Sequence, residues 1–111
     1  MTTPKTDLDG ALRAWARGDF AAEAAVDLLL WQNRVISPHA PWINVQSDYA
    51  AIDPDRLAND VAGLSGGERR VVAIAASLLG GPPVDLRDAL GNLDDAVTRK
   101  VLAALSHACG F

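Results

Sequence analysis

The chain has 111 residues, the size of one domain, and ten Lys and Arg against fourteen Asp and Glu give a net charge of −4. This acidic balance weighs against nucleic-acid binding, no apolar run approaches the roughly 18 residues of a membrane span, and the single cysteine cannot form an internal disulfide. We therefore expect a cytoplasmic protein without a membrane segment, built mainly from helices because alanine is abundant and aromatic residues are few.

Two helices are predicted in the first third of the chain. After a flexible terminus at 1–6, apolar residues at helical spacing indicate a helix over 7–17, which Gly18 ends. Asp19 fits the N-cap of a second helix, over about 20–33. The short joint predicts an antiparallel or sharply angled pair.

The three tryptophans bear on the core and on the surface. Trp15 and Trp31 lie on the apolar stripes of the two helices, so we expect both in the core. Trp42 lies in a proline-containing stretch, 34–52, that we interpret as an irregular loop over the helices. Such a tryptophan is either a candidate interface anchor or a cover for the core. Residues 43–46 alternate in polarity and could form a short strand, but they have no evident partner.

The next helix is the most clearly marked element of the sequence. Ser65 and Glu68 have the spacing of a capping box at its start, and a Gly-Gly-Pro-Pro run ends it. Within 71–79 the only polar residue is Ser77. A helix that is apolar nearly all round is normally buried, so the helix at about 66–79 is predicted to form the centre of the domain.

Shorter elements flank this helix. The Asp-Pro pair at 53–54 marks the start of a helix that ends at Gly63. Asp85 can cap a single turn, and Asp94 can cap a last helix over 95–108.

The predicted fold is therefore mainly α. We expect one compact domain over 7–110, a bundle of four or five helices around the buried central helix at about 66–79, with the irregular loop at 34–52 lying across it.

The segment from Leu64 to Asp95 carries a family resemblance. LSGGE at 64–68 resembles the signature motif of ABC-type ATPases, and the Ala-rich helix and the GNLD at 91–94 resemble the helix and D-loop that follow that motif. In that family the signature Ser and Gly backbone faces a nucleotide phosphate. The family's lysine-containing phosphate loop and its water-activating glutamate have no counterpart here, so we expect no ATP hydrolysis.

The candidate ligand-binding residues follow from this motif: Ser65, Gly66 and Gly67, with Arg69 and Arg70 close behind. Backbone N–H groups and the dipole at a helix start attract phosphate. The alternative, which we prefer, is a capping box whose glutamate occupies the donors and repels an anion.

A longer pattern covers most of the chain. The chain resembles a group of small, uncharacterised bacterial proteins of about this length. Four segments carry the resemblance: RAWARGDFAAEAAVDLLL, SGGERR, IAASLLGGPPVDLRDALGNLD and ALSHACG. This resemblance implies a free-standing unit and supplies no catalytic residues.

The remaining polar residues indicate structure rather than chemistry. His39 and His107 are interpreted as surface or capping residues, and His107 with Cys109 offers too few ligands for a zinc site. Cys109 is expected to be a buried, inert thiol. Each acidic cluster lies where a helix start favours an acid. We expect no catalytic residue, no metal and no cofactor.

Three functions remain open from the sequence. The first is a non-catalytic cytoplasmic interaction or regulatory protein that binds a protein partner or a second copy of itself. The second is a phosphate- or nucleotide-binding protein that uses the helix start at 65–67. The third and weakest is a helix-turn-helix DNA binder over 53–79, whose second helix is too apolar to read base edges.

Overall fold

The computed structural model describes residues 5–111 of the chain, so the flexible terminus expected at 1–6 falls mainly outside the described residues. The described part is mainly α, with one small β-hairpin. In chain order the elements are α1 (Lys5–Ala16), α2 (Phe20–Gln32), β1 (Ile43–Gln46), β2 (Tyr49–Ile52), α3 (Pro54–Asp60), α4 (Gly66–Leu78), α5 (Leu86–Ala89) and α6 (Asp95–Ala108). The single turn predicted after Asp85 is α5, and it makes a sixth helix within residues 5–111.

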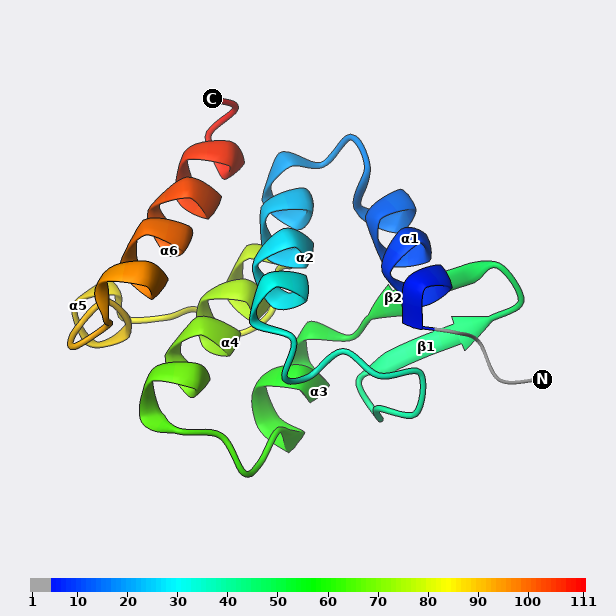
Figure 1. Cartoon of the computed structure of the whole chain (residues 1–111), viewed down its shortest axis with the longest axis horizontal. Coiled ribbons are helices and arrows are strands. Elements are labelled where there is room, and N and C mark those ends of the chain that lie inside the picture. Colours follow the sequence, from blue (N-terminus) through cyan, green and yellow to red (C-terminus); the bar gives the residue numbers. More distant parts are fainter. Residues whose placement is uncertain (1–4) are drawn as a thin grey trace.

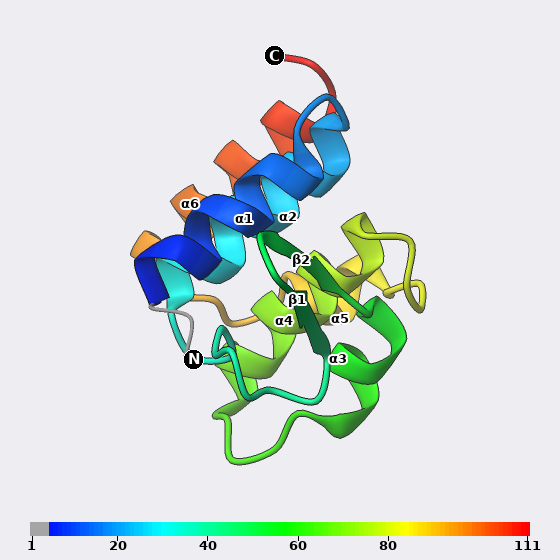
Figure 2. The ribbon, with the colours of Figure 1, turned by 90° about the vertical axis from the view of Figure 1, so that its right-hand side faces the viewer.

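The elements form two layers around α2 and α4. Figure 1 shows α2 lying between α1 and α6, and Figure 2 shows the hairpin, α3, α4 and α5 beneath this three-helix layer. The helix α2 packs against α1, α4 and α6, while α4 also packs against α3 and α5. None of the helices in residues 5–111 is long and apolar enough to cross a bilayer.

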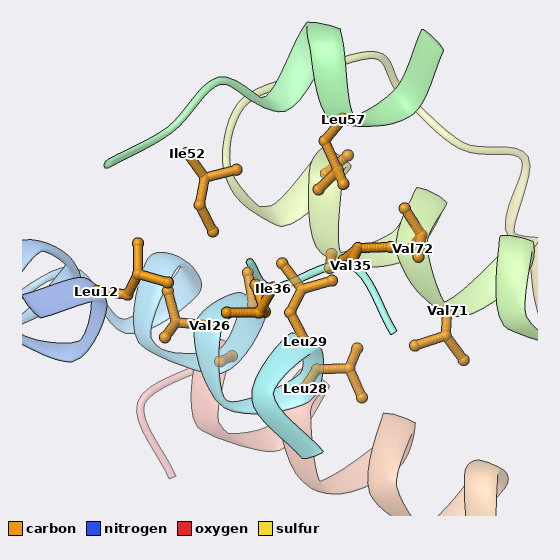
Figure 3. Close-up of a cluster of buried hydrophobic side chains, with 14 of the residues drawn as sticks. Leu12, Val26, Leu28, Leu29, Val35, Ile36, Ile52, Leu57, Val71 and Val72 are labelled. Carbon is orange, nitrogen blue, oxygen red and sulfur yellow. The ribbon is translucent and has the colours of Figure 1, made fainter. Parts of the chain in front are cut away.

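The core lies between these two central helices. Figure 3 shows Leu28 and Leu29 of α2 in one cluster with Val71 and Val72 of α4. Each fully buried side chain of this size stabilises the fold by about 1.5–3 kcal/mol. The prediction that α4 is buried is confirmed, because five of its residues are inaccessible: Val71, Val72, Ile74, Ala75 and Ala76. Six residues of α2 are also buried, so the two helices share the centre.

The stretch at 34–52 is more ordered than a loop. Residues 43–46, left open as a possible strand, form β1, and β1 pairs antiparallel with β2, which was not predicted. The turn between the strands places Ser47 at φ 55°, without the glycine or asparagine that usually marks such a turn. A two-stranded hairpin is marginal alone, and here α1 packs on β2.

Two predictions of burial are wrong. Trp31 is 43% exposed, and Cys109 is exposed. Trp31 lies within about 40° of Asp27 and Phe20 around the axis of α2, so it lies along that helix's polar edge. Cys109 caps the end of α6, beyond the last core contact of that helix.

Two glycines permit the joints between elements. Gly18, at φ +92°, allows the tight reversal between α1 and α2. A Cβ on Gly81 would lie 2.8 Å from Cβ of Pro54 and 2.8 Å from the carbonyl oxygen of Ala76. The end of α4 therefore approaches the start of α3 more closely than any side chain would allow.

Candidate functional site

The start of α4 is the site that the sequence singled out, and it is closed by its own hydrogen bonds. The Ser65 hydroxyl accepts a bond of 3.2 Å from the backbone N–H of Glu68, and the Glu68 carboxylate accepts one of 2.9 Å from the backbone N–H of Ser65. This reciprocal pair is the predicted capping box.

The Glu68 carboxylate is held at this position by a second contact. The other oxygen of this carboxylate lies 3.1 Å from Nε of Arg34. The side chain of Gln32 donates a hydrogen bond to the backbone carbonyl of Glu68. The hydrogen bond from Ser65 N–H, and then the charge of Arg34, keep the pKa of Glu68 below its usual value. A fixed negative charge therefore stands where an anion would have to bind.

The other candidate residues do not converge on Ser65. Gly66 is exposed and Gly67 half-buried, as the start of a surface helix requires. Arg69 lines a pocket of about 360 Å³ between α3 and α4, and neither Ser65 nor the two glycines line it. Within residues 5–111, no ion pair is made by Arg69 or Arg70.

Trp42 folds onto the core. Its indole N–H donates a 2.8 Å hydrogen bond to the carbonyl oxygen of Val35, and its half-buried ring packs against the hydrophobic core. This geometry corresponds to the second of the two alternatives, in which Trp42 covers the core.

A pocket that the sequence did not indicate lies where α1, α2 and α6 meet. Its volume is about 480 Å³, within the range of small-molecule sites. The apolar lining consists of small side chains from all three helices: Ala16, Ala24, Val26, Ala103 and Ala104. Figure 1 shows α1 and α6 on either side of α2, and residues of all three helices line the pocket.

Charged side chains surround the pocket and tie the three helices together. Asp27 of α2 lies 3.5 Å from Arg13 of α1 and 3.0 Å from Lys100 of α6. Both pairs are partly solvated, so each contributes about 0–1 kcal/mol to stability. Their larger effect is to hold the charged side chains of α1, α2 and α6 in place next to one another.

Glu23 makes the second link across the pocket. One of its carboxylate oxygens accepts a 3.0 Å hydrogen bond from Gly18 N–H, and the other lies 2.7 Å from Nε2 of His107, whose ring packs edge-on against Phe20. The Gly18 bond and then the His107 bond lower the pKa of Glu23, and the charge of Arg17 adds to this effect.

The sequence contained only part of this arrangement. Glu23 and Asp27 are the two acidic residues of a largely apolar helix, and His107 lies near the end of the last helix. Nothing in the local spacing joined them, because Glu23 and His107 are 84 positions apart. Within residues 5–111, no group of three or more His, Cys, Asp or Glu side chains could hold a metal ion.

Comparisons of the chain with protein-family models, with curated proteins and with solved structures give no match. The resemblance of Leu64 to Asp95 to ABC-type ATPases, and that of the whole pattern to small bacterial proteins, therefore stay predictions.

Proposed function

We propose that this protein is a non-catalytic regulatory protein that responds to a small molecule bound between α1, α2 and α6. The observation that carries the proposal is the 480 Å³ pocket with its apolar lining and charged rim. Sites for small molecules are typically concave, largely apolar and furnished with a few polar groups that fix orientation.

The connectivity of the pocket supports a regulatory role. Its walls come from α1 and α6, which both pack on α2, and α2 packs on α4 in the other layer. A ligand that touches both walls would favour one arrangement of the three helices, and a ligand shifts an equilibrium by its differential affinity for the two states.

The chemistry of the rim supports binding over catalysis. The carboxylates of Glu23 and Asp27 are engaged in hydrogen bonds and ion pairs, and the low pKa of Glu23 makes it a poor proton acceptor near neutral pH. The proposed location is the cytoplasm, since Cys109 has no partner cysteine that would require an oxidising compartment. A protein partner or a second copy of the chain would read out the ligand-bound state.

A library of small neutral, anionic and cationic compounds tests this proposal. Binding is followed by amide chemical shifts of the full chain and by melting temperature. We expect bound compounds to shift pocket residues from all three helices together and to raise stability, by about 2.7 kcal/mol at a hundredfold excess over the dissociation constant.

Two matched variants show whether the pocket is the site. Ala103→Leu fills the pocket from an exposed position on α6, and we expect it to abolish binding. Ala96→Leu adds the same side chain to an exposed position of α6 outside the pocket and should leave binding unchanged. Equal binding to both variants would contradict the proposal.

ATP and inorganic phosphate, added to the same experiment, test the second candidate function. Changes in amide chemical shift centred on residues 65–70, with a rise in melting temperature, would favour the phosphate-binding alternative at the start of α4. Turnover of ATP above a boiled-protein blank would overturn the non-catalytic assignment.

A further inference from the structure

Both carboxylates at the rim of the α1–α2–α6 pocket already have partners. Both carboxylate oxygens of Glu23 have a donor, Gly18 N–H and Nε2 of His107. Both carboxylate oxygens of Asp27 face a cation, at 3.5 Å and 3.0 Å. A ligand ammonium would reach only the second lone pairs of these oxygens, where the donors and cations already bound offset much of the negative charge.

The donors at the same rim are not used up. Arg17 lines the pocket, and its side chain makes no hydrogen bond or ion pair with the described residues, although its charge acts on Glu23. Arg13 lines it too, and its single contact, with Asp27, is long at 3.5 Å. A guanidinium group has five N–H donors, so most of the donor capacity of these two side chains is free for a ligand.

The charge balance indicates how much negative charge fits. Arg13 and Arg17 line the pocket together with the carboxylates of Glu23 and Asp27. Lys100 lies outside the lining but pairs with Asp27, and this third cation leaves one positive charge on the group, with His107 counted as neutral. A single carboxylate matches this charge and the fork geometry of a guanidinium group. The alanine lining between α2 and α6 provides the surface for an apolar group attached to that carboxylate.

We infer that the pocket binds a small organic monocarboxylate, with its carboxylate on Arg17 and Arg13 and its apolar body against the alanines of α2 and α6. This inference rests on the proposed function and adds the chemical class of the ligand. A multiply charged phosphate compound fits less well, because it brings more negative charge than the rim balances.

Four probes of defined chemistry test the class. Hexanoate combines a carboxylate with an apolar chain, hexanamide has the same chain without the charge, hexylamine reverses the charge, and inorganic phosphate has no apolar body. Titration of the full chain, followed by amide shifts, should show hexanoate binding at the pocket about tenfold more tightly than hexanamide. Hexylamine and phosphate should leave the pocket resonances unshifted.

A charge-matched pair of variants assigns the carboxylate to Arg17. Arg17→Gln should weaken hexanoate binding about tenfold and leave hexanamide binding unchanged. Arg99→Gln removes an equal charge from an exposed position of α6 outside the pocket and should alter neither. Both variants should melt like the parent without ligand, because both side chains are exposed.

The outcomes separate this inference from the proposed function. Equal affinity for hexanoate and hexanamide, or equal effects of the two arginine variants, would overturn the monocarboxylate class. Pocket binding of hexanamide or hexylamine without hexanoate would do the same and would still support a small-molecule site. A pocket that no probe and no library compound shifts would overturn both.

Discussion

The start of α4 and the α1–α2–α6 pocket each place a glutamate next to a backbone N–H, but the partners of the two glutamates lie at different distances along the sequence. Glu68 bonds to Ser65, three positions away, and its other oxygen pairs with Arg34, whereas Glu23 bonds to Gly18 nearby and to His107 near the other end of the chain. At α4 the capping pair is complete within four residues, and the Glu68 carboxylate, which also pairs with Arg34, lies in front of the helix. At the pocket both carboxylates are engaged by hydrogen bonds and ion pairs, while most guanidinium N–H donors of Arg13 and Arg17 stay unpaired within residues 5–111.

This difference explains why a motif and a site need not coincide. A capping box can be recognised from four residues, and it stabilises a helix whether or not a ligand exists. A pocket exists only where several elements fail to fill the space between them, which no four residues can encode. If this explanation is right, changes to Ile74, Trp42 and Ser65 should alter the stability of the fold and not the binding of a ligand in the pocket.

The largest effect is expected in the body of α4. Ile74 is 3% exposed, so Ile74→Asp would bury a charge without a partner, at a cost of several kcal/mol against a total stability of about 5–15 kcal/mol. We expect loss of the cooperative thermal transition. Leu102→Asp is the matched control on a side chain that is 57% exposed, and it should melt near the parent's temperature. A parent-like melt for Ile74→Asp would mean that α4 is not central to the core.

Trp42→Ala should have the next largest effect. The variant loses half-buried ring contacts and the hydrogen bond to Val35, which together should lower the free energy of unfolding by about 2 kcal/mol. Trp42→Phe keeps an aromatic ring and should lose about 1 kcal/mol, mainly from the unpaired carbonyl of Val35. Chemical denaturation measures both values. An unchanged stability of Trp42→Ala, with lost self-association, would restore Trp42 as an interface anchor.

Ser65→Ala should lower the free energy of unfolding by about 1 kcal/mol, the usual contribution of a serine N-cap. Phosphate should not stabilise the parent, because the helix start is blocked by the Glu68 carboxylate. Ser106→Ala, at an exposed position of α6, is the control and should be neutral. A thermal shift with phosphate that is present in the parent and absent in Ser65→Ala and Gly67→Ala would show that α4 carries an anion site after all.

The smallest effect is expected from acid. The folded-state pKa of Glu23 lies below its ordinary value of 4.5, so its stabilising contribution is complete above that pH and is lost as the pH falls through the lower, folded value. Glu68 behaves in the same way. Unfolding measured between neutral and acidic pH should therefore show a steeper loss of stability for the parent than for Glu23→Gln or Glu68→Gln. Parallel pH profiles would show that neither carboxylate favours the folded state.

The hairpin shows why part of the fold could not be predicted. The alternation at 43–46 was visible, but its partner β2 begins with two residues, Tyr49 and Ala50, that carry no clear strand pattern. The turn at Ser47 lacks the usual residue types. The decisive interaction is the packing of α1 on β2, and it depends on a helix more than 30 positions earlier in the chain.

The sequence by itself determined where α2 to α6 begin, because a capping side chain bonds to a backbone N–H two or three positions away. All the observed N-caps were predicted: Asp19, Asp53, Ser65, Asp85 and Asp94. Only the tertiary structure decided which edge of α2 faces water, that Trp31 and Cys109 are exposed, and that Glu23 meets His107. These features depend on how α1 and α6 pack on α2, and such contacts leave no periodic trace in the local sequence.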